Sequence, residues 1–284
     1  MTIKMAVAYL NGEWMAPEDA KVSVFDRGFM FGDSIYEVMA VYDGRVFAIE
    51  EHLIRMNKSL DAISLDSPYS DEEWLLILNE AVIRADETPA YLYLQITRGV
   101  GFPRSDIYPK LVKPTVLITV THAPILERDK ITPYRMVTKD DFRWARGDIK
   151  VTSLMANGLI KNEAIKEGYD DALLFRNGEL TESTSSNVFV VKDEKVKTPL
   201  KSNFLLHGIT RDFLLRVLFV NDIPFEEGKV FKEEILTADE IWVTSTGREV
   251  WPVVEVNGVL IGKENPGVLW KKVNAFFQEF KQKL

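Results

Sequence analysis

The stretch LTESTSSNVFVV (Leu180–Val191) places an acid and a cluster of hydroxyl side chains directly before a run of apolar residues. The apolar run is rich in β-branched residues and predicts a strand. Glu182, just before it, could hold a protonated ring nitrogen of a bound cofactor. A polar turn, in which Ser and Asn side chains bond the local backbone, explains the same letters. Both interpretations stand on this stretch alone.

Three lysines lie upstream, in GDIKVTSLMANGLIKNEAIKEG (Gly147–Gly168). Lys161 and Lys166 stand beside glutamates at helical spacing, which is typical of solvated helix positions. Lys150 instead closes the extended run DFRWARGDIK, where an apolar strand end could keep its amine from water. A desolvated amine is a better nucleophile toward a carbonyl, as a Schiff-base lysine must be. An ordinary exposed lysine also fits, because most lysines lie at the surface.

Two downstream segments have features of an anion site. LHGITRDFLL begins a predicted helix at Ile209 and Thr210, whose backbone N–H groups and hydroxyl suit a phosphate; an N-cap threonine is the competing interpretation. VTSTGREV puts Ser245 and Thr246 at the end of an apolar strand, where successive N–H groups can surround an anion or simply form a turn.

Apolar residues recur every three or four positions in Glu50–Ile63, which predicts an amphipathic helix carrying Arg55. Arg55 would face inward only if an anion or carboxylate lay there, whereas surface pairs with neighbouring acids are commoner. The other predicted helices are 71–85, 153–167, 210–221 and a tail after Asn265-Pro266. The predicted strands include 90–99, 114–122, 171–176, 187–191 and 240–246, with hairpin turns at Asn11-Gly12, Asp43-Gly44 and Asn177-Gly178.

These elements mix helices and hairpins without the regular alternation of a doubly wound sheet, which favours an α+β fold. The polar stretch APILERDKITP interrupts the pattern. We therefore predict an N-terminal α+β domain at 1–122, a linker at 123–133 and a C-terminal α+β domain at 134–284 that carries Lys150.

Composition narrows the function. The chain has 284 residues, 46% of them hydrophobic, and a net charge of -8, which argues against nucleic acid or an anionic membrane as a partner. It has no Cys and three dispersed His, so no disulfide and no metal site are expected. P-loop, GxGxxG, HExxH and GxSxG motifs are missing. Without a signal peptide or a run near ~18 apolar residues, the sequence predicts a soluble, cytoplasmic protein.

The spacing of these segments resembles the signature of class IV aminotransferases, the pyridoxal phosphate enzymes of fold-type IV. The signature is carried by ESTSSNVF, VKT and LHGITR, and it extends through FDRGFMFGDSIYEV, EEHLIRM, YLQITRG, RW-R-DIK and VTST. The resemblance covers nearly the whole chain and is nearest to D-amino acid transaminases. It implies a two-domain α+β fold shared with branched-chain aminotransferases, with pyridoxal 5'-phosphate between the domains.

The resemblance also implies roles for single residues. Lys150 matches the catalytic lysine that binds the cofactor and moves the proton, and Glu182 matches the acid at the pyridine nitrogen. The remaining matches are Arg55, Ile209, Thr210 and Thr246 with the phosphate cup, Ser245 beside them, Ser185 and Ser186 with hydroxyls next to the ring, and Tyr36 with a tyrosine on the substrate side.

One motif departs from the family. D-amino acid transaminases carry an Arg-x-His pair that binds the substrate carboxylate, and this chain has Arg104, Ser105 and Asp106 instead. A carboxylate at Asp106 would repel the substrate or pair with Arg104.

The implied reaction moves an amino group between an amino acid, expected to be a D-amino acid such as D-alanine, and a 2-oxo acid. The resemblance also implies a homodimer. Branched-chain L-amino acid transaminases, R-amine transaminases and aminodeoxychorismate lyases share the fold, so these activities remain alternatives.

Overall fold

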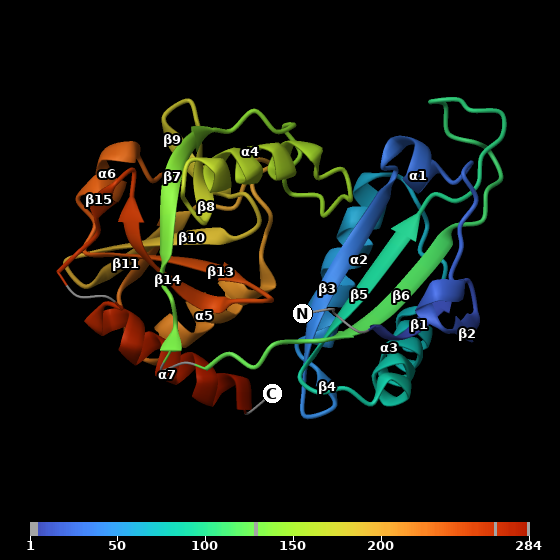
Figure 1. Ribbon diagram of the computed structural model, residues 1–284, viewed down its shortest axis with the longest axis horizontal. Coiled ribbons are helices and arrows are strands. Elements are labelled where there is room, and N and C mark those ends of the chain that lie inside the picture. The colour runs from blue at the N-terminus through green and yellow to red at the C-terminus, as the bar shows by residue number, and fades with distance from the viewer. Residues whose placement is uncertain (1–4, 128–129, 264–265, 283–284) are drawn as a thin grey trace. The chain divides into compact units, whose positions relative to one another are not determined.

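The computed structural model describes residues 5–127, 130–263 and 266–282. The chain divides into two compact units (Figure 1). The first consists of Met1–Ile125 and Ile149–Ser153, and the second of Leu126–Asp148 and Leu154–Leu284. None of the helices described is both long and apolar enough to cross a membrane.

The first unit is built on a six-stranded antiparallel sheet in the order β2-β1-β6-β5-β3-β4. Its strands are β1 Met5–Leu10, β2 Glu13–Met15, β3 Ser34–Tyr42, β4 Arg45–Val46, β5 Ala90–Thr97 and β6 Thr115–His122. Its helices are η1 Pro17–Asp19, α1 Arg27–Phe31, α2 Ile49–Ala62 and α3 Asp71–Ala85. The predicted helices at 50–63 and 71–85 and the predicted strands at 90–99 and 114–122 are therefore confirmed to within two residues.

Helices α2 and α3 supply the core of this unit. The apolar stripe of α2 packs Met56 and Leu60 against the sheet, and α3 adds Trp74 and Leu78, all of them almost fully buried. A capping box starts α3, because Ser70 accepts from the Glu73 backbone while the Glu73 carboxylate accepts from the Ser70 backbone.

The predicted hairpin turns have the backbone that their residues favour. Asn11 and Gly12, Asp43 and Gly44, and Asn177 and Gly178 all have positive φ. This is the conformation of two-residue turns that match the twist of the flanking strands.

The second unit contains a mixed sheet in the order β12-β11-β10-β13-β14-β7-β8-β9, with β15 on β14. Strands β7, β8 and β14 run parallel to their neighbours in this group, as do β11 and β12. The strands are β7 Tyr134–Asp140, β8 Asp171–Arg176, β9 Glu179–Ser183, β10 Asn187–Lys192, β11 Lys195–Pro199, β12 Phe225–Gly228, β13 Glu240–Ser245, β14 Glu249–Val256 and β15 Val259–Leu260.

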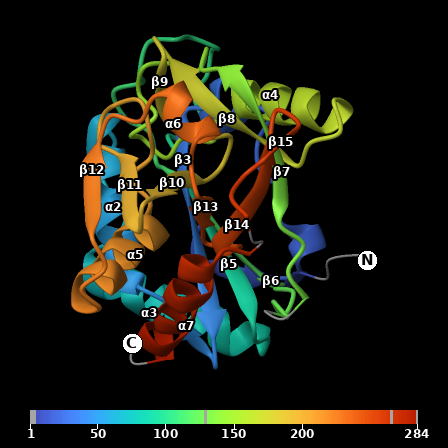
Figure 2. The same ribbon diagram turned by 90° about the vertical axis from the view of Figure 1, so that its left-hand side faces the viewer.

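The helices of the second unit are α4 Met155–Lys166, α5 Ile209–Val220, α6 Lys232–Leu236 and α7 Val268–Gln282. Helices α5 and α7 lie side by side in Figure 2, and the rings of Phe213 and Phe280 meet at 5.9 Å. The predicted C-terminal helix is present. Its predicted N-cap, Asn265, lies outside the described residues.

The structure differs from the sequence prediction around Lys150. The extended run that begins at Tyr134 ends as a strand at Asp140, and an irregular segment follows, so Lys150 does not close a strand. The chain then joins the edge of β3, where the Tyr36 N–H donates to the Lys150 carbonyl at 2.9 Å. Because of this pairing, Ile149–Ser153 belongs to the first unit, whereas the sequence predicts Lys150 in the second.

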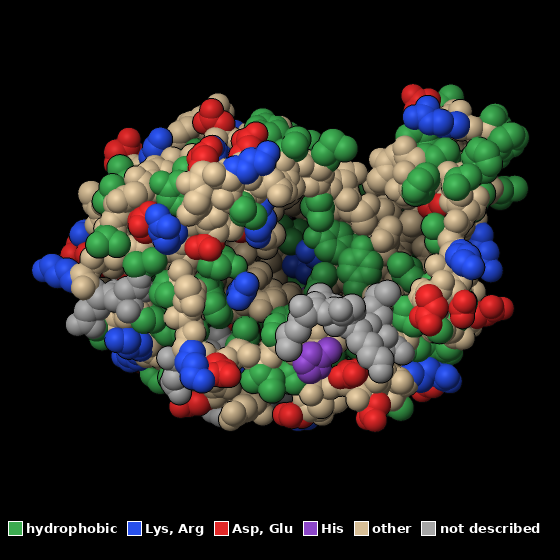
Figure 3. All heavy atoms as spheres, viewed as in Figure 1, with side chains coloured by type: hydrophobic (Ala, Val, Ile, Leu, Met, Phe, Trp, Pro, Cys, Tyr) green, Lys and Arg blue, Asp and Glu red, His purple; other side chains and the backbone are tan. Residues whose placement is uncertain are grey.

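A long loop, residues 98–114, joins β5 to β6 and contains no helix or strand. Hydrophobic side chains gather on it at the upper right of Figure 3. Phe102 and Ile107 are each 77% exposed, and Leu111 is 96% exposed. We call this segment the 98–114 loop.

Candidate active site

The Lys150 amine lies over an aromatic ring. Its Nζ is 4.2 Å from the centroid of Tyr36, the residue opposite it across the edge of β3. Cross-strand neighbours of this kind share a face of the sheet. The ring shields the amine on one side and attracts its charged form. The structure therefore brings together two of the predicted site residues, Lys150 and Tyr36.

The next residue of β3, Glu37, points to the opposite face and pairs with Arg55. The Arg55 Nε and Nη2 lie 2.8 and 2.6 Å from the two oxygens of Glu37, and His52 Nδ1 lies 2.8 Å from Oε2. Burial would raise the pKa of Glu37, but the charge and hydrogen bonds of Arg55, assisted by His52, lower it to about 2. Burial lowers the pKa of His52 against the opposing effect of Glu37.

Glu37 is therefore ionised and can only accept, so the neutral His52 ring donates from Nδ1. Arg55, predicted to hold a phosphate, already has a carboxylate partner that balances its charge. Any anion it held would share the guanidinium with Glu37.

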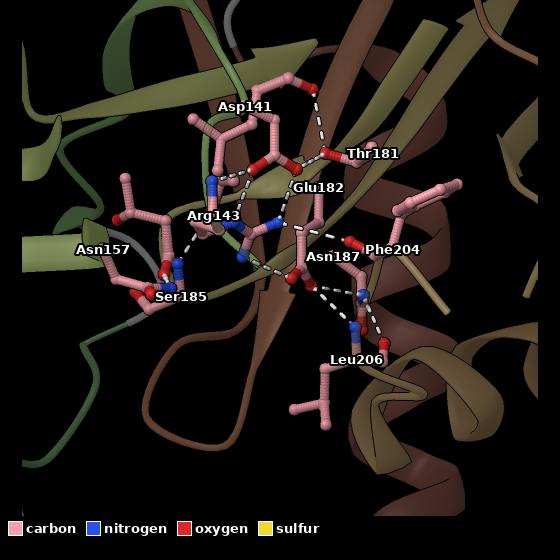
Figure 4. Close-up of polar contacts among 12 residues, drawn as sticks. Asp141, Arg143, Asn157, Thr181, Glu182, Ser185, Asn187, Phe204 and Leu206 are labelled. Carbon is pink, nitrogen blue, oxygen red and sulfur yellow. Dashed lines mark hydrogen bonds and ion pairs between the residues drawn. The ribbon is translucent and has the colours of Figure 1, made fainter. Parts of the chain in front are cut away.

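In the second unit, Glu182 is buried within a polar network (Figure 4). Its Oε1 accepts from Arg143 Nη1 at 2.7 Å. Its Oε2 accepts from Asn187 Nδ2 at 3.3 Å and from the Leu206 backbone N–H at 3.2 Å. Arg143 also pairs with Asp141, its Nε lying 2.9 Å from Oδ1 and its Nη2 3.0 Å from Oδ2.

Burial raises the pKa of Glu182 to about 7, even though Arg143 and the Leu206 N–H lower it. Burial lowers the pKa of Arg143, but the hydrogen bonds and charges of Asp141 and Glu182 raise it further than burial lowers it. Arg143 therefore remains charged. Glu182 is thus an acid that can share a proton near neutral pH with a basic group placed beside it.

Sequence reasoning missed Arg143 and Asp141 as site residues. Both lie in or beside the run DFRWAR, which the sequence predicts to be extended. The signal that could have found them is a pair of oppositely charged residues that flank one apolar residue, seven to nine positions before the candidate catalytic lysine.

The hydroxyl residues after β9 form a tight turn. Ser183 N–H donates to the Ser186 carbonyl at 2.8 Å, and Ser185 is exposed at the tip. Asn157 of α4 donates to the Thr184 carbonyl at 2.7 Å (Figure 4). The Ser185 N–H also donates to the Ser183 Oγ at 3.4 Å, so a serine side chain bonds the local backbone as the polar-turn interpretation expected. The turn still presents Ser185 and Ser186 near the surface of the unit.

Helix α5 begins beside this network. Gly208 is its N-cap and provides no side-chain cap, so no side chain caps the N–H groups of the first turn, which includes Ile209 and Thr210. A Cβ on Gly208 would lie 2.1 Å from Oδ1 of Asn187, the residue that donates to Glu182. The close approach of backbone to Asn187 explains why glycine is needed here.

The end of β13 comes to the same place. Thr244 is the register partner of Asn187, and Ser245 and Thr246 follow it, partly exposed. The buried Oγ1 of Thr244 has no hydrogen-bond partner among the residues described. Asn187 thus connects three predicted parts of the site, namely Glu182, the start of α5 and the end of β13.

Residues 34–256 match the family model for amino-transferase class IV. The chain is a class IV aminotransferase. It is 38% identical over 268 residues to the D-alanine aminotransferase of Bacillus licheniformis, a match that covers 94% of each chain. It is 34% identical over 272 residues to that of Listeria monocytogenes, covering 95% of this chain and 94% of the relative.

Solved structures of the same fold include the branched-chain amino acid aminotransferase of Escherichia coli, with a TM-score of 0.89 and 26% identity over 98% of this chain and 95% of that one. The branched-chain amino acid aminotransferase of T.th., complexed with N-(5'-phosphopyridoxyl)-L-glutamate, gives a TM-score of 0.87 and 25% identity, over 98% and 94% of the two chains. The predicted two-domain α+β fold of type IV is therefore confirmed.

Class IV aminotransferases use pyridoxal 5'-phosphate, and the chemical groups of this aminotransferase suit it. An amine such as that of Lys150 would suit its aldehyde, and the raised pKa of Glu182 suits a protonated pyridine nitrogen. The start of α5, without a side-chain cap, suits a phosphate. This aminotransferase is thus a pyridoxal phosphate-dependent enzyme that takes an amino acid and a 2-oxo acid as substrates.

Proposed function

We propose that this aminotransferase exchanges the amino group of a D-amino acid, D-alanine foremost, with a 2-oxo acid. The relation that carries the proposal is the 38% identity to the D-alanine aminotransferase of Bacillus licheniformis over 94% of both chains. By comparison, the branched-chain enzymes of the same fold are 24 to 26% identical.

Lys150 is proposed as the catalytic base and acid. When bound, pyridoxal phosphate accepts the electron pair of the carbon that loses its proton. Lys150 would remove that proton from the α-carbon of the amino acid and return it to the cofactor carbon. Proton transfer by a positioned group of this kind contributes on the order of 10²- to 10⁴-fold in rate. The ring of Tyr36, 4.2 Å from Nζ, limits the positions that the amine can take.

Glu182 is proposed to keep a proton on the pyridine nitrogen, with Arg143 holding the carboxylate in place. The proposed phosphate contacts are Arg55, Ile209, Thr210, Ser245 and Thr246, with Ser185 and Ser186 beside the ring. Tyr36 and Arg104 are proposed on the substrate side.

Arg104 is the proposed partner of the substrate carboxylate. Its guanidinium carbon lies 4.5 Å from the centroid of the Phe31 ring. Within the described ranges, Arg104 forms no ion pair with Asp106, and both side chains are exposed. The expectation that Asp106 would neutralise Arg104 therefore has no support from the geometry of the loop.

A branched-chain L-amino acid transaminase is the second candidate, favoured by the TM-scores of the branched-chain enzymes. R-amine transaminase and aminodeoxychorismate lyase activities remain alternatives on the same fold. We further propose that the enzyme works as a homodimer in the cytoplasm. Light scattering of the purified holoenzyme tests the dimer, and subcellular fractionation tests the location.

The role of Lys150 is tested by borohydride reduction of the holoenzyme followed by peptide mapping. The cofactor should be found on Lys150, and Lys150→Ala should abolish transamination. Lys166→Ala is the matched control, because this exposed residue lies at the end of α4. Lys161 is less suitable, since its Nζ lies 3.2 Å from the buried Asp171. Label on another lysine would refute the assignment.

The substrate is tested with a panel of D- and L-amino acids and R-amines, each with and without pyruvate or 2-oxoglutarate. Turnover of D-alanine that requires the oxo acid supports the proposal. Preference for L-valine or L-leucine would support the second candidate, and product release without an oxo acid would indicate a lyase. Asp106→His should lower KM for D-alanine if position 106 contributes to carboxylate binding.

A further inference from the structure

The 98–114 loop is unusually long for a segment without helix or strand. Loops of this length in compact domains are generally functional or disordered. This one carries Arg104 and exposes several large apolar side chains, so something other than burial must fix its path.

The loop is held at Gly101 by the Phe25 carbonyl, at Tyr108 by the stacked Arg98 guanidinium, and next to Arg104 by Arg27. The Arg27 side chain is only 4% exposed, yet its Nη1 lies 2.5 Å from the Ser105 carbonyl and 3.4 Å from that of Ile107, and its Nη2 lies 3.3 Å from the Asp106 carbonyl. One guanidinium therefore holds the backbone of the three residues after Arg104, namely Ser105, Asp106 and Ile107.

The cost of burying Arg27 is offset by Asp33. The Arg27 Nε donates to Asp33 Oδ2 at 2.7 Å, and Arg98 Nε donates to the same oxygen at 2.8 Å. Two buried guanidinium groups thus share one carboxylate, and the remaining N–H groups need acceptors. The remaining N–H groups of Arg98 donate to the carbonyls of Ile63 and Ser64, which fixes the Arg98 side chain to the end of α2.

Helix α1, which carries Arg27, is firmly attached to the sheet. Asp26 caps the helix by accepting from Gly28 N–H, and its other oxygen accepts from Thr115 Oγ1 at 2.7 Å. A Cβ on Gly28 would lie 2.5 Å from the Thr97 side chain, so the helix lies directly against the end of β5. The position of the Arg27 side chain is thereby defined by the sheet.

The other end of α1 contacts Arg104 itself. The ring of Phe31 lies 4.5 Å from the Arg104 guanidinium carbon and 4.7 Å from that of Arg27. Phe31 is only partly buried, so the stacked Arg104 remains at the surface of the unit.

We propose that α1 is the support of the substrate-binding arginine, with Arg27 as a positioning residue that shapes the 98–114 loop and Phe31 as the ring that orients Arg104. This inference rests on the proposed role of Arg104 in binding the substrate carboxylate. Both residues are proposed to act through Arg104, without direct contact with substrate or cofactor.

Steady-state kinetics with D-alanine tests the proposal on Arg27→Lys, which keeps the charge beside Asp33 but loses the planar fork. KM should rise about tenfold while kcat changes less than about twofold, because the lost interaction binds ground and transition states alike. Phe31→Leu should change KM in the same direction. If Arg27 acts through Arg104, the double variant Arg27→Lys, Arg104→Ala should have the KM of Arg104→Ala alone.

Limited trypsin digestion of the holoenzyme gives a second readout that needs no turnover. Arg104 and Lys110 are exposed cleavage sites on the loop. Arg27→Lys should speed cleavage there about tenfold, since carbonyl bonds to a charged donor are lost and the loop opens more often. Arg84→Lys is the control, because Arg84 is a half-exposed arginine of the same unit that pairs with Glu80.

An unchanged cleavage rate in Arg27→Lys would contradict the proposal that Arg27 holds the 98–114 loop in place. Faster cleavage of Arg27→Lys with an unchanged KM would contradict the proposal that Arg27 acts through Arg104. A double variant whose KM increase is the product of the increases in the two single variants would contradict it too. Neither outcome would contradict the proposed transamination of D-alanine. A native enzyme that does not turn over D-alanine overturns the proposed function itself, which the substrate panel reports before any variant is made.

Discussion

Arg143 Nη1 and Glu182 Oε1 lie 2.7 Å apart, and both side chains are more than nine-tenths buried. Despite this partner, burial raises the pKa of Glu182 to about 7. The pair therefore holds a carboxylate in a fixed orientation without removing its affinity for a proton. That combination is what a group must have if it is to stabilise positive charge on a neighbouring ring nitrogen.

Replacing the acid tests this relationship most directly. Glu182→Gln keeps the shape and can still accept from Arg143 but cannot carry charge, so kcat should fall on the order of a hundredfold or more. Steady-state kinetics and the absorption spectrum of the bound cofactor measure the change. Glu179→Gln, on the same strand but paired with the exposed Lys229, should retain native kcat. A Glu182→Gln enzyme within twofold of native would contradict the role.

Replacing the arginine tests the support of that acid. Arg143→Gln leaves Glu182 buried without its cation and Asp141 with Arg176 alone, and the free energy of unfolding should fall by about 3–5 kcal/mol. Urea unfolding of the apoprotein measures it. Arg146→Gln should leave the midpoint unchanged, because Arg146 pairs with Asp148 at the surface. An equal effect of both variants would show that burial of Arg143 is not what matters.

The Glu37 cluster predicts acid sensitivity of the first unit. The folded-state pKa of Glu37 is about 2, below its ordinary value of 4.5, so its contribution is fully present above pH 4.5 and is lost as pH falls toward 2. The contribution is on the order of 3 kcal/mol. Native protein and Glu37→Gln should therefore converge in unfolding free energy as the solution is acidified. Glu50→Gln, exposed in the first turn of α2, the helix that carries His52 and Arg55, should show no such convergence.

Gly208, at the start of α5, connects the proposed phosphate site to Glu182, the proposed partner of the ring nitrogen, because both lie next to Asn187. In Gly208→Ala the new methyl would displace Asn187, which donates to Glu182 and to the Leu206 carbonyl. The affinity for pyridoxal phosphate should fall about tenfold, a typical cost of overpacking. Titration of the apoprotein by absorbance measures this affinity. Gly158→Ala in α4 meets nothing within 4 Å and should leave affinity unchanged.

The sequence predicts most elements because each has a strong local signal. The stripe of α2 and the Asn-Gly and Asp-Gly turns are decided within a few residues, and the structure has all of them. The prediction of Lys150 rests partly on a strand expected to end there. The strand ends at Asp140 instead, so the family spacing, and not the local pattern, is what singles out this lysine.

What the sequence could not predict depends on long-range pairing. Arg143 meets Glu182 across 39 positions, and Arg27 meets the 98–114 loop across 78 or more. The capture of Arg55 by Glu37 likewise requires that a strand and a helix already lie together. No periodicity reports such contacts, because each partner alone looks like an ordinary surface charge.

The return of Ile149–Ser153 to the edge of β3 also bears on how the chain is made. The first unit is not contiguous: its edge is completed by residues that follow the first strand of the second unit. During synthesis the N-terminal unit can therefore form its helices and most of its sheet early, but its edge at β3 stays open until residue 153 has left the ribosome. The lysine proposed for catalysis arrives with that closing segment, so a nascent chain that ends before it cannot yet capture the cofactor.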